Sequence, residues 1–376
     1  LRLLPPDDVA DVIQGSPPEL RDPMLALLDD QARRDVVALL AYKEDVAGGL
    51  MSTRFARLRP DMSVDEAIQY LRRQARERVE TLYYAYVLGP AQHLLGVISF
   101  RELFAARPGA LVQDVMTTDT VTVPESMDQE AVARLIVDND LIAVPVVDSE
   151  RRMKGIITVD DIVDVMREEA TEDIQKVGGS EALSGPYLGV RMSEMIKKRA
   201  GWLTILFIGE MFTATAMTYF QAEIERAVVL ALFVPLIISS GGNSGSQAST
   251  LIIRALALGE IALRDWPRVL RREVISGLTL GLVLGAIGFC RVLLWSAVFH
   301  NVYGPHFFLV AAVVGISLIG CVTWGAVSGS MLPFVLRRVG FDPASASAPF
   351  VATLIDVTGL IIYFSVASVI FLRELT

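Results

Sequence analysis

A carboxylate lies inside an apolar stretch that is long enough to cross a bilayer. Asp356 stands within the run VATLIDVTGLIIYFSVASVIFL, and a charged side chain at the centre of a bilayer costs about 3 kcal/mol or more. On a helix, Ala348 and Ala352 precede Asp356 by two turns and by one turn. The three residues would form a stripe that suits a cation path, because intramembrane acids mostly face water-filled cavities. The alternative is a structural acid that pairs with an arginine such as Arg291 or with hydroxyl groups.

A glycine-rich segment, GGNSGSQ, interrupts a second apolar run. Gly241 and Gly242 would let two backbones approach closely, which predicts a tight helix crossing. Asn243 beside exposed carbonyl groups would instead line a hydrophilic path. Glu210 is a third polar residue in an apolar run. It could be a pore or proton-linked group, or a hydrogen-bonded acid that fixes helices, and the sequence leaves both open.

Oxygen ligands of this kind suit hard cations. Neither His nor Cys lies near the stripe, so a zinc or copper site is not expected. Mg²⁺ is often held by only one or two carboxylates, and a two-fold dimer would bring two copies of Asp356 to one axis. Cys290 and Cys321 lie in apolar segments, where we expect them to pack helices.

The charge distribution divides the chain into two unlike halves. Residues 1–199 carry 34 Asp and Glu against 24 Lys and Arg, whereas residues 200–376 carry 9 acids and 10 Arg. The acidic half lacks the basic footprint that nucleic acids need, so we expect no nucleic-acid partner. The second half predicts a membrane domain. Its expected spans are 201–220, 227–253, 274–299, 307–336 and 346–372.

The basic residues predict the orientation of these spans. Lys197, Lys198 and Arg199 precede the first span, five arginines separate the second from the third, and Arg337 and Arg338 follow the fourth. Because positive loops face the cytoplasm, we expect a multi-pass protein of the bacterial inner (plasma) membrane with a cytosolic N-terminus. An odd number of spans then places the C-terminus outside.

Residues 46–168 contain an internal repeat. RPDMSVDEAIQYL is echoed by VPESMDQEAVARLI, and LLGVISFREL by MKGIITVDDI. The pattern resembles a tandem of CBS domains, with units at 46–108 and 109–168. Residues 1–45 predict short helices, which we expect to be the C-terminal part of a larger helical domain that begins before Leu1. Residues 169–199 predict a connecting helix that GGSEALSGP interrupts.

The order of these parts and the motifs YKEDVAGGLMST, GGNSGSQ and PFVATLIDVTGLIIY resemble the MgtE family of magnesium channels and transporters. The resemblance implies a multidomain fold: an α-helical N-terminal piece, an α/β CBS pair, a plug helix at 169–199 and a five-helix membrane domain at 200–376. It also implies a homodimer in contact with membrane lipid, with Mg²⁺ as both substrate and regulator. The family's pore-lining row maps to Asp356, Ala352 and Ala348, and its glycine-rich run to Gly241–Gln247.

The resemblance further implies regulatory and nucleotide sites. The positions that match regulatory Mg²⁺ ligands are Asp7, Asp11, Asp128, Glu130, Asp161, Glu169, Glu172, Asp173 and Asp342. Each of these acids could instead be a solvated surface group. Tyr84, Arg101 and Glu102 match contacts to ATP or another adenine nucleotide, although Glu102 stands where the family usually has Asp.

The expected function is a passive divalent-cation channel, selective for Mg²⁺ and driven by the membrane potential. Cytosolic Mg²⁺ that binds the acidic faces would close it. One alternative is a secondary transporter that exchanges Mg²⁺ for H⁺ or Na⁺, with Glu210 as the coupling acid. Another is a non-transporting CBS sensor of metal or nucleotide. No enzyme is expected, because the sequence contains no nucleophile–base pair, hydrolase motif or nucleotide-hydrolysis loop.

Overall fold

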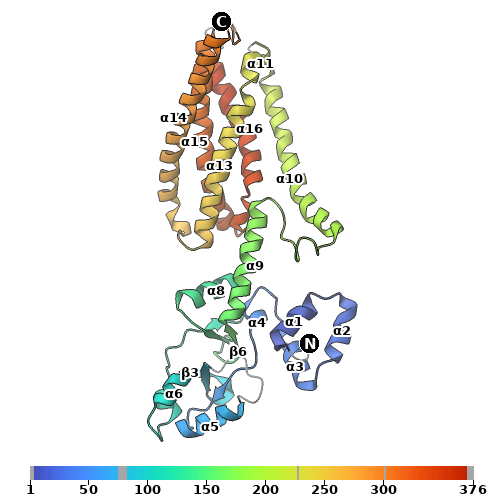
Figure 1. The fold of residues 1–376 in the computed structure, drawn as a ribbon, viewed down its shortest axis with the longest axis vertical. Helices are drawn as coiled ribbons and strands as arrows, with labels where there is room; N and C mark the ends of the chain where they lie inside the picture. Colours follow the sequence, from blue (N-terminus) through green and yellow to red (C-terminus); the bar gives the residue numbers. More distant parts are fainter. Residues whose placement is uncertain (1–3, 75–82, 227, 300–301, 371–376) are drawn as a thin grey trace. The chain divides into compact units, whose positions relative to one another are not determined.

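The computed structural model describes residues 4–74, 83–226, 228–299 and 302–370 (Figure 1). The chain forms two compact units, Leu1–Glu169 and Ala170–Thr376. The first combines short helices with two small sheets, and the second is helical.

The first unit begins with three short helices, which are followed by two copies of a strand–helix–strand–strand–helix pattern. Its elements are α1 (Pro6–Gln14), α2 (Pro18–Ala26), α3 (Asp30–Leu39), α4 (Ala47–Leu50), β1 (Arg57–Leu58), α5 (Val64–Gln74), β2 (Tyr84–Leu88), η1 (Pro90–Gln92), β3 (Leu94–Ser99), α6 (Phe100–Ala105), α7 (Val112–Val115), β4 (Val123–Pro124), α8 (Gln129–Asp138), β5 (Ala143–Val147), β6 (Met153–Thr158) and the start of α9 (Val159–Val177).

The two sheets have the same topology and the same irregularity. β2 pairs parallel with β1 and antiparallel with β3, and β5 pairs likewise with β4 and β6. The antiparallel register shifts between Val87 and Leu88 in one sheet and between Val146 and Val147 in the other. The repeat in the sequence therefore produces two copies of one fold.

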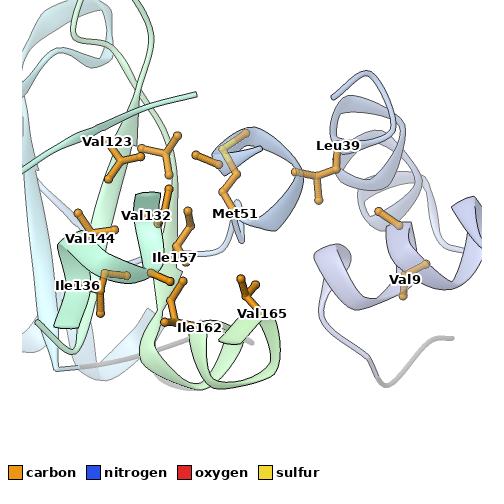
Figure 2. Close-up of a cluster of buried hydrophobic side chains, with 14 of the residues drawn as sticks. Val9, Leu39, Met51, Val123, Val132, Ile136, Val144, Ile157, Ile162 and Val165 are labelled. Atoms are coloured by element: carbon orange, nitrogen blue, oxygen red, sulfur yellow. The ribbon is translucent and has the colours of Figure 1, made fainter. Parts of the chain in front are cut away.

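A cluster of buried apolar side chains joins the N-terminal helices to the second copy. Figure 2 shows Val9 and Leu39 from α1 and α3, Met51 beside α4, and further side chains from β4 to α9. Val9 and Ile13 lie on one face of α1, as the helical spacing of its apolar residues predicts. Burial of one such side chain stabilises the fold by about 1.5–3 kcal/mol.

The second unit contains five helices that are long and apolar enough to span a membrane, as found among the described residues. Its elements are the end of α9, α10 (Met192–Tyr219), α11 (Gln221–Arg226), α12 (Val228–Ala231), α13 (Val234–Ala257), η2 (Leu263–Asp265), α14 (Trp266–Val298), α15 (Phe307–Val339), η3 (Pro343–Ser345) and α16 (Ala348–Ile370). The five predicted spans are confirmed as apolar helices, although the first helix begins at Met192 rather than near residue 201.

Glycines set the distance between α13 and α15. A Cβ atom added to Gly325 would overlap the carbonyl oxygen of Gly241, and one added to Gly245 would lie 3.0 Å from the carbonyl oxygen of Gly325. Contacts this close leave no room for a side chain. The glycine-rich segment thus forms a tight helix crossing, as one interpretation of GGNSGSQ predicts.

The connection between α9 and α10 consists of a loop between two helices. α9 ends at Val177, and Gly179 has φ +76°, a conformation that glycine adopts at little cost. In the loop, the Oγ of Ser184 donates to the carboxylate of Glu194 at 2.5 Å, and Lys198 Nζ donates to the carbonyl of Ala182. The basic residues expected before the first span, Lys197, Lys198 and Arg199, therefore lie in the first turns of α10.

Candidate functional site

A cavity of about 370 Å³ in the second unit brings together residues of α10, α13 and α16. It contains five of the seven residues that the sequence predicted for an ion path. Its lining is Glu210, Thr213, Pro235, Ile238, Ser239, Gly242, Asn243, Ser246, Ala352 and Asp356. Carboxylate, amide and hydroxyl oxygens thus face one space inside the helical bundle.

The other two predicted residues do not line this cavity. Gly241 faces α15, where an added Cβ would lie 3.0 Å from the carbonyl oxygen of Cys321. The carbonyl oxygen of Ala348 accepts a hydrogen bond from the Ser246 hydroxyl at 3.1 Å, which ties α16 to α13. The close helix crossing and the cavity lining thus lie on different faces of α13.

Two hydroxyl residues of the cavity, Ser239 and Thr213, were missed from the sequence, whereas Ser246 lies in the predicted glycine-rich run. Ser239 and Ser246 stand one turn before Asn243 and one turn after Gly242. Thr213 follows Glu210 by three positions, a spacing that places both on one face of a helix. Its buried hydroxyl has no hydrogen-bond partner among the residues that the structure describes. The spacing from Glu210 was the signal that could have revealed it.

Arg291 is not the partner of Asp356, contrary to the alternative weighed from the sequence. Its guanidinium lies 3.6 Å from the centroid of the Trp295 ring and donates from Nη1 to the Tyr303 hydroxyl at 3.3 Å. Within the described ranges, neither Asp356 nor Glu210 forms an ion pair. The cavity therefore carries acidic groups that no side chain of the described residues neutralises.

A lysine ammonium lies between two of the acids assigned to regulation. Lys176 Nζ is 2.6 Å from Asp342 Oδ2, and it also pairs with Glu172 one turn earlier on α9. Burial alone would lower the pKa of Lys176, but the hydrogen bonds and charges of Asp342 and Glu172 raise it above its usual value. The ammonium therefore bridges the two carboxylates.

Asp11 lies among other acids of the first unit. Desolvation raises the pKa of Asp11 to about 6, and the charges of its acidic neighbours add to this effect. Asp7, on the same helix, is buried. The neighbours are Glu44, Asp8, Glu168 and Asp161. The structure thus brings Asp11 and Asp161 together and adds three acids that the sequence did not single out.

The remaining regulatory candidates lie near the start of α8 and on α9. Asp128 caps α8 by accepting from the backbone N–H of Glu130 at 3.0 Å, and Glu130 itself pairs with Arg134. Glu169 accepts from Gln129 Nε2 at 2.5 Å, and Asp173 follows it by four positions on α9. Over the described ranges, no three or more of these acids converge closely enough to hold a metal ion.

A cavity of about 580 Å³ in the first unit contains all three nucleotide candidates, Tyr84, Arg101 and Glu102. Glu102 also caps α6, because its carboxylate accepts from the backbone N–H of Ser99 at 2.7 Å. Tyr86, which the sequence did not suggest, lines the same cavity and is 1% exposed. Its hydroxyl has no hydrogen-bond partner in the described part of the chain.

Comparisons with known proteins agree across the chain. Residues 234–366 match the MgtE family described as divalent cation transporter, residues 1–45 match the MgtE intracellular N domain, and residues 45–109 and 112–168 match the CBS domain. The magnesium transporter MgtE of Thermus thermophilus is 43% identical over 364 residues, which cover 96% of this chain and 78% of that protein. This chain belongs to the MgtE family of magnesium transporters.

Two further matches lie in the same family. The magnesium transporter MgtE of Enterococcus faecalis is 36% identical, over 89% of this chain and 71% of that protein. A solved structure of the cytosolic domain of the Mg²⁺ channel MgtE in complex with ATP is 43% identical, covers 43% of this chain and 66% of its own, and superposes with a TM-score of 0.42. MgtE membership confirms the resemblance and the fold class, and makes this chain a membrane protein with a cytosolic N-terminal part. Family membership favours a transporter over the alternative of a CBS sensor that transports nothing.

Proposed function

We propose that this MgtE chain forms a passive Mg²⁺ channel whose ion path contains Asp356. The observation that carries the proposal is the oxygen-lined cavity, where Asp356 lies beside Asn243 and hydroxyl groups without a cationic partner among the described residues. Mg²⁺ gives up its water reluctantly and is commonly bound through few carboxylates. A hydrated or partly hydrated ion therefore fits this lining better than a fully dehydrated one.

The proposed channel is a homodimer in a bacterial plasma membrane, with its C-terminus outside. The apolar part of α10 is left uncovered within one chain, so lipid or a second chain must cover it. A two-fold axis near α16 would supply two Asp356 carboxylates for one divalent ion. An inside-negative potential then drives entry, since a divalent charge gains about 4–5 kcal/mol per 100 mV.

The proposed gate is closed by cytosolic Mg²⁺. Ions that bind among the acids of α1, α8 and the start of α9, or among the acids at the end of α9 and in the loop before α16, would neutralise their repulsion and hold the end of α9 in place. The packing of Val177 against Ile253, Ala344 and Ala346 provides the contact through which α9 acts on the membrane helices. The coupling arises because the ion binds one of two states more tightly.

Replacing Asp11 by asparagine is expected to stabilise the cytosolic part at pH 8 by about 1 kcal/mol, with little change at pH 4. The pKa of Asp11 in the folded chain is about 6, above its ordinary value of 3.8, so the native chain loses stability as the pH rises through this interval. The effect on stability is small because Asp11 keeps an exposed face, where solvent screens the charge. Thermal unfolding of the native full chain and of Asp11→Asn at both pH values measures this difference in stability.

Exposed Asp22, on the neighbouring helix α2, provides the matched control. Asp22→Asn removes the same charge and should leave the unfolding temperature unchanged. Added Mg²⁺ should stabilise the native chain at pH 8 more than it stabilises Asp11→Asn. An equal Mg²⁺ effect on both would remove Asp11 from the proposed sensor.

We also propose that the cavity of about 580 Å³ binds an adenine nucleotide such as ATP. Its volume suits a small ligand, and the buried Tyr86 hydroxyl, which has no hydrogen-bond partner among the described residues, offers a polar group to it. Replacing Arg101 by glutamine should weaken ATP binding about tenfold, the usual loss for a charged hydrogen bond. Arg107→Gln, an exposed change outside the cavity, should leave the affinity measured by calorimetry unaltered.

The alternative of Mg²⁺/H⁺ or Mg²⁺/Na⁺ exchange rests on one observation, that Glu210 and Asp356 line the same cavity. Proteoliposomes with an imposed inside-negative potential, equal pH and no Na⁺ distinguish the two mechanisms. A passive channel admits Mg²⁺ under these conditions, and Glu210→Gln retains most of the uptake. Uptake that requires an opposing H⁺ or Na⁺ gradient, and that Glu210→Gln abolishes, would establish the exchanger.

A further inference from the structure

A second large cavity of the first unit takes no part in the functions proposed above. Its volume is about 690 Å³, and it is lined by β1 and the residues after it, by α5, and by the turn between β2 and β3. Three arginines, Arg57, Arg59 and Arg73, line it together with Tyr70 and one acid, Asp61. It shares no residue with the cavity that contains Tyr84 and Arg101.

The charge of this cavity is opposite to the net charge of residues 1–199. Residues 1–199 have ten more acids than basic residues, yet here three guanidinium groups meet a single carboxylate. Asp61 pairs with Arg59 at 3.4 Å, and both side chains are more than 70% exposed, so solvent weakens this pair. Neither Arg57 nor Arg73 has an ion pair within the described ranges.

Aromatic rings orient Arg57 and Arg73. The Arg57 guanidinium lies 4.4 Å from the centroid of the Phe55 ring, and that of Arg73 lies 5.9 Å from the centroid of Tyr70. A ring contact restrains the guanidinium and leaves N–H groups at its edge for other acceptors. Such edges match the oxygens of a phosphate group, which two parallel hydrogen bonds can bind.

The internal repeat shows that the fold does not need these arginines. Val87 and Val146 hold the same place in the two sheets, because each is the last residue before the register shift. Leu58 pairs with Val87, and Val123 pairs with Val146, so Leu58 and Val123 are equivalent positions of the repeat. At the same spacing, Ser63 and Asp128 are equivalent, and each accepts from the backbone N–H three residues later at the start of its helix. The residues that correspond to Arg57, Arg59 and Arg73 are Thr122, Pro124 and Asp138.

We propose that this cavity binds a small anion that carries a pyrophosphate group, either free or as part of a nucleotide. Three guanidinium groups against one carboxylate favour a multiply charged ligand over a singly charged one. The volume lies within the range of about 300–1,000 Å³ that is typical of small-molecule sites. Met62 and Leu88 in the lining leave apolar surface for an organic part of the ligand.

Calorimetric titration of the purified full chain, without Mg²⁺, tests the proposal with inorganic pyrophosphate and with ADP as separate probes. The Arg101→Gln variant serves as the background, so that the other cavity contributes little. Adding Arg57→Gln and Arg73→Gln should raise the dissociation constant of the tighter probe at least about tenfold. Adding Arg72→Gln instead, an exposed change one position from Arg73 that does not line the cavity, should alter it less than about twofold.

The two probes also separate the sources of the ligand. Pyrophosphate that binds as tightly as ADP identifies a free inorganic anion, and ADP that binds more tightly identifies a nucleotide. Arg57 and Arg73 are exposed, so the variant with Arg57→Gln and Arg73→Gln should unfold at the same temperature as the native chain. If this variant unfolds at a lower temperature, Arg73→Gln alone is used for the titration. The proposal is wrong if neither probe binds, or if Arg72→Gln weakens binding as much as Arg73→Gln.

Discussion

Replacing Asp356 by asparagine is expected to lower Mg²⁺ uptake roughly 1,000-fold, because the change removes the charge and keeps the volume. A charge pair 4 Å apart at an effective dielectric constant of about 20 is worth about 4 kcal/mol, and each 1.4 kcal/mol corresponds to a factor of ten. Asp356 shares its cavity with polar groups of α10 and α13 that stay in place in the variant. The loss should therefore appear in ion flux and leave the fold intact.

Uptake by proteoliposomes under an inside-negative potential measures this effect. Glu260→Gln is the matched control, because Glu260 is an exposed acid that follows α13 and does not line the cavity. The control should transport at the native rate. Native uptake by the Asp356→Asn variant would remove Asp356 from the ion path.

Replacing Lys176 by glutamine is expected to raise Mg²⁺ flux at low cytosolic Mg²⁺ about 5- to 30-fold. The change leaves Glu172 and Asp342 facing each other without the ammonium that joins them. These partly exposed pairs contribute about 1–2 kcal/mol together, which corresponds to that range of population change. Without Mg²⁺ the end of α9 loosens, whereas at high Mg²⁺ an ion can replace the ammonium and restore closure.

The expected signature is a flux that depends more steeply on cytosolic Mg²⁺ than in the native chain. Lys197→Gln, an exposed change in the first turns of α10, is the control and should behave as the native chain. Asp342→Asn combined with Lys176→Gln should relieve the repulsion, and the non-additive part of the double-mutant cycle measures the contact. Equal fluxes in the Lys176 and Lys197 variants at all Mg²⁺ concentrations would contradict the role of this contact.

Several residues that line the cavity of the second unit were predictable from the sequence because they are conspicuous one at a time. Asp356, Asn243 and Glu210 are polar groups inside apolar runs, and a bilayer makes any such group costly. Helical spacing places Ala352 one turn before Asp356, and both line the cavity. The five apolar helices and the repeated sheets were predictable for the same reason, since each depends on a local pattern.

Contacts between distant segments were not predictable in this way. Lys176 and Asp342 are 166 positions apart, and nothing in either local sequence indicates that they meet. The acids around Asp11 come from α1, α9 and the residues after α3, so only the packed unit shows that they raise its pKa. Arg291 was a plausible partner for Asp356 by depth alone, but Trp295 and Tyr303 engage it instead. Side-chain partners depend on helix rotation and packing, which hydropathy does not encode.

Single-channel recording from the purified protein in a planar bilayer tests the central claim most directly, with Mg²⁺ varied on the side of the CBS domains. We predict unitary Mg²⁺ currents under a potential alone, with an open probability that falls as Mg²⁺ on that side rises. Slow flux without unitary currents, dependent on a pH or Na⁺ gradient, would contradict the channel and favour an exchanger coupled through Glu210.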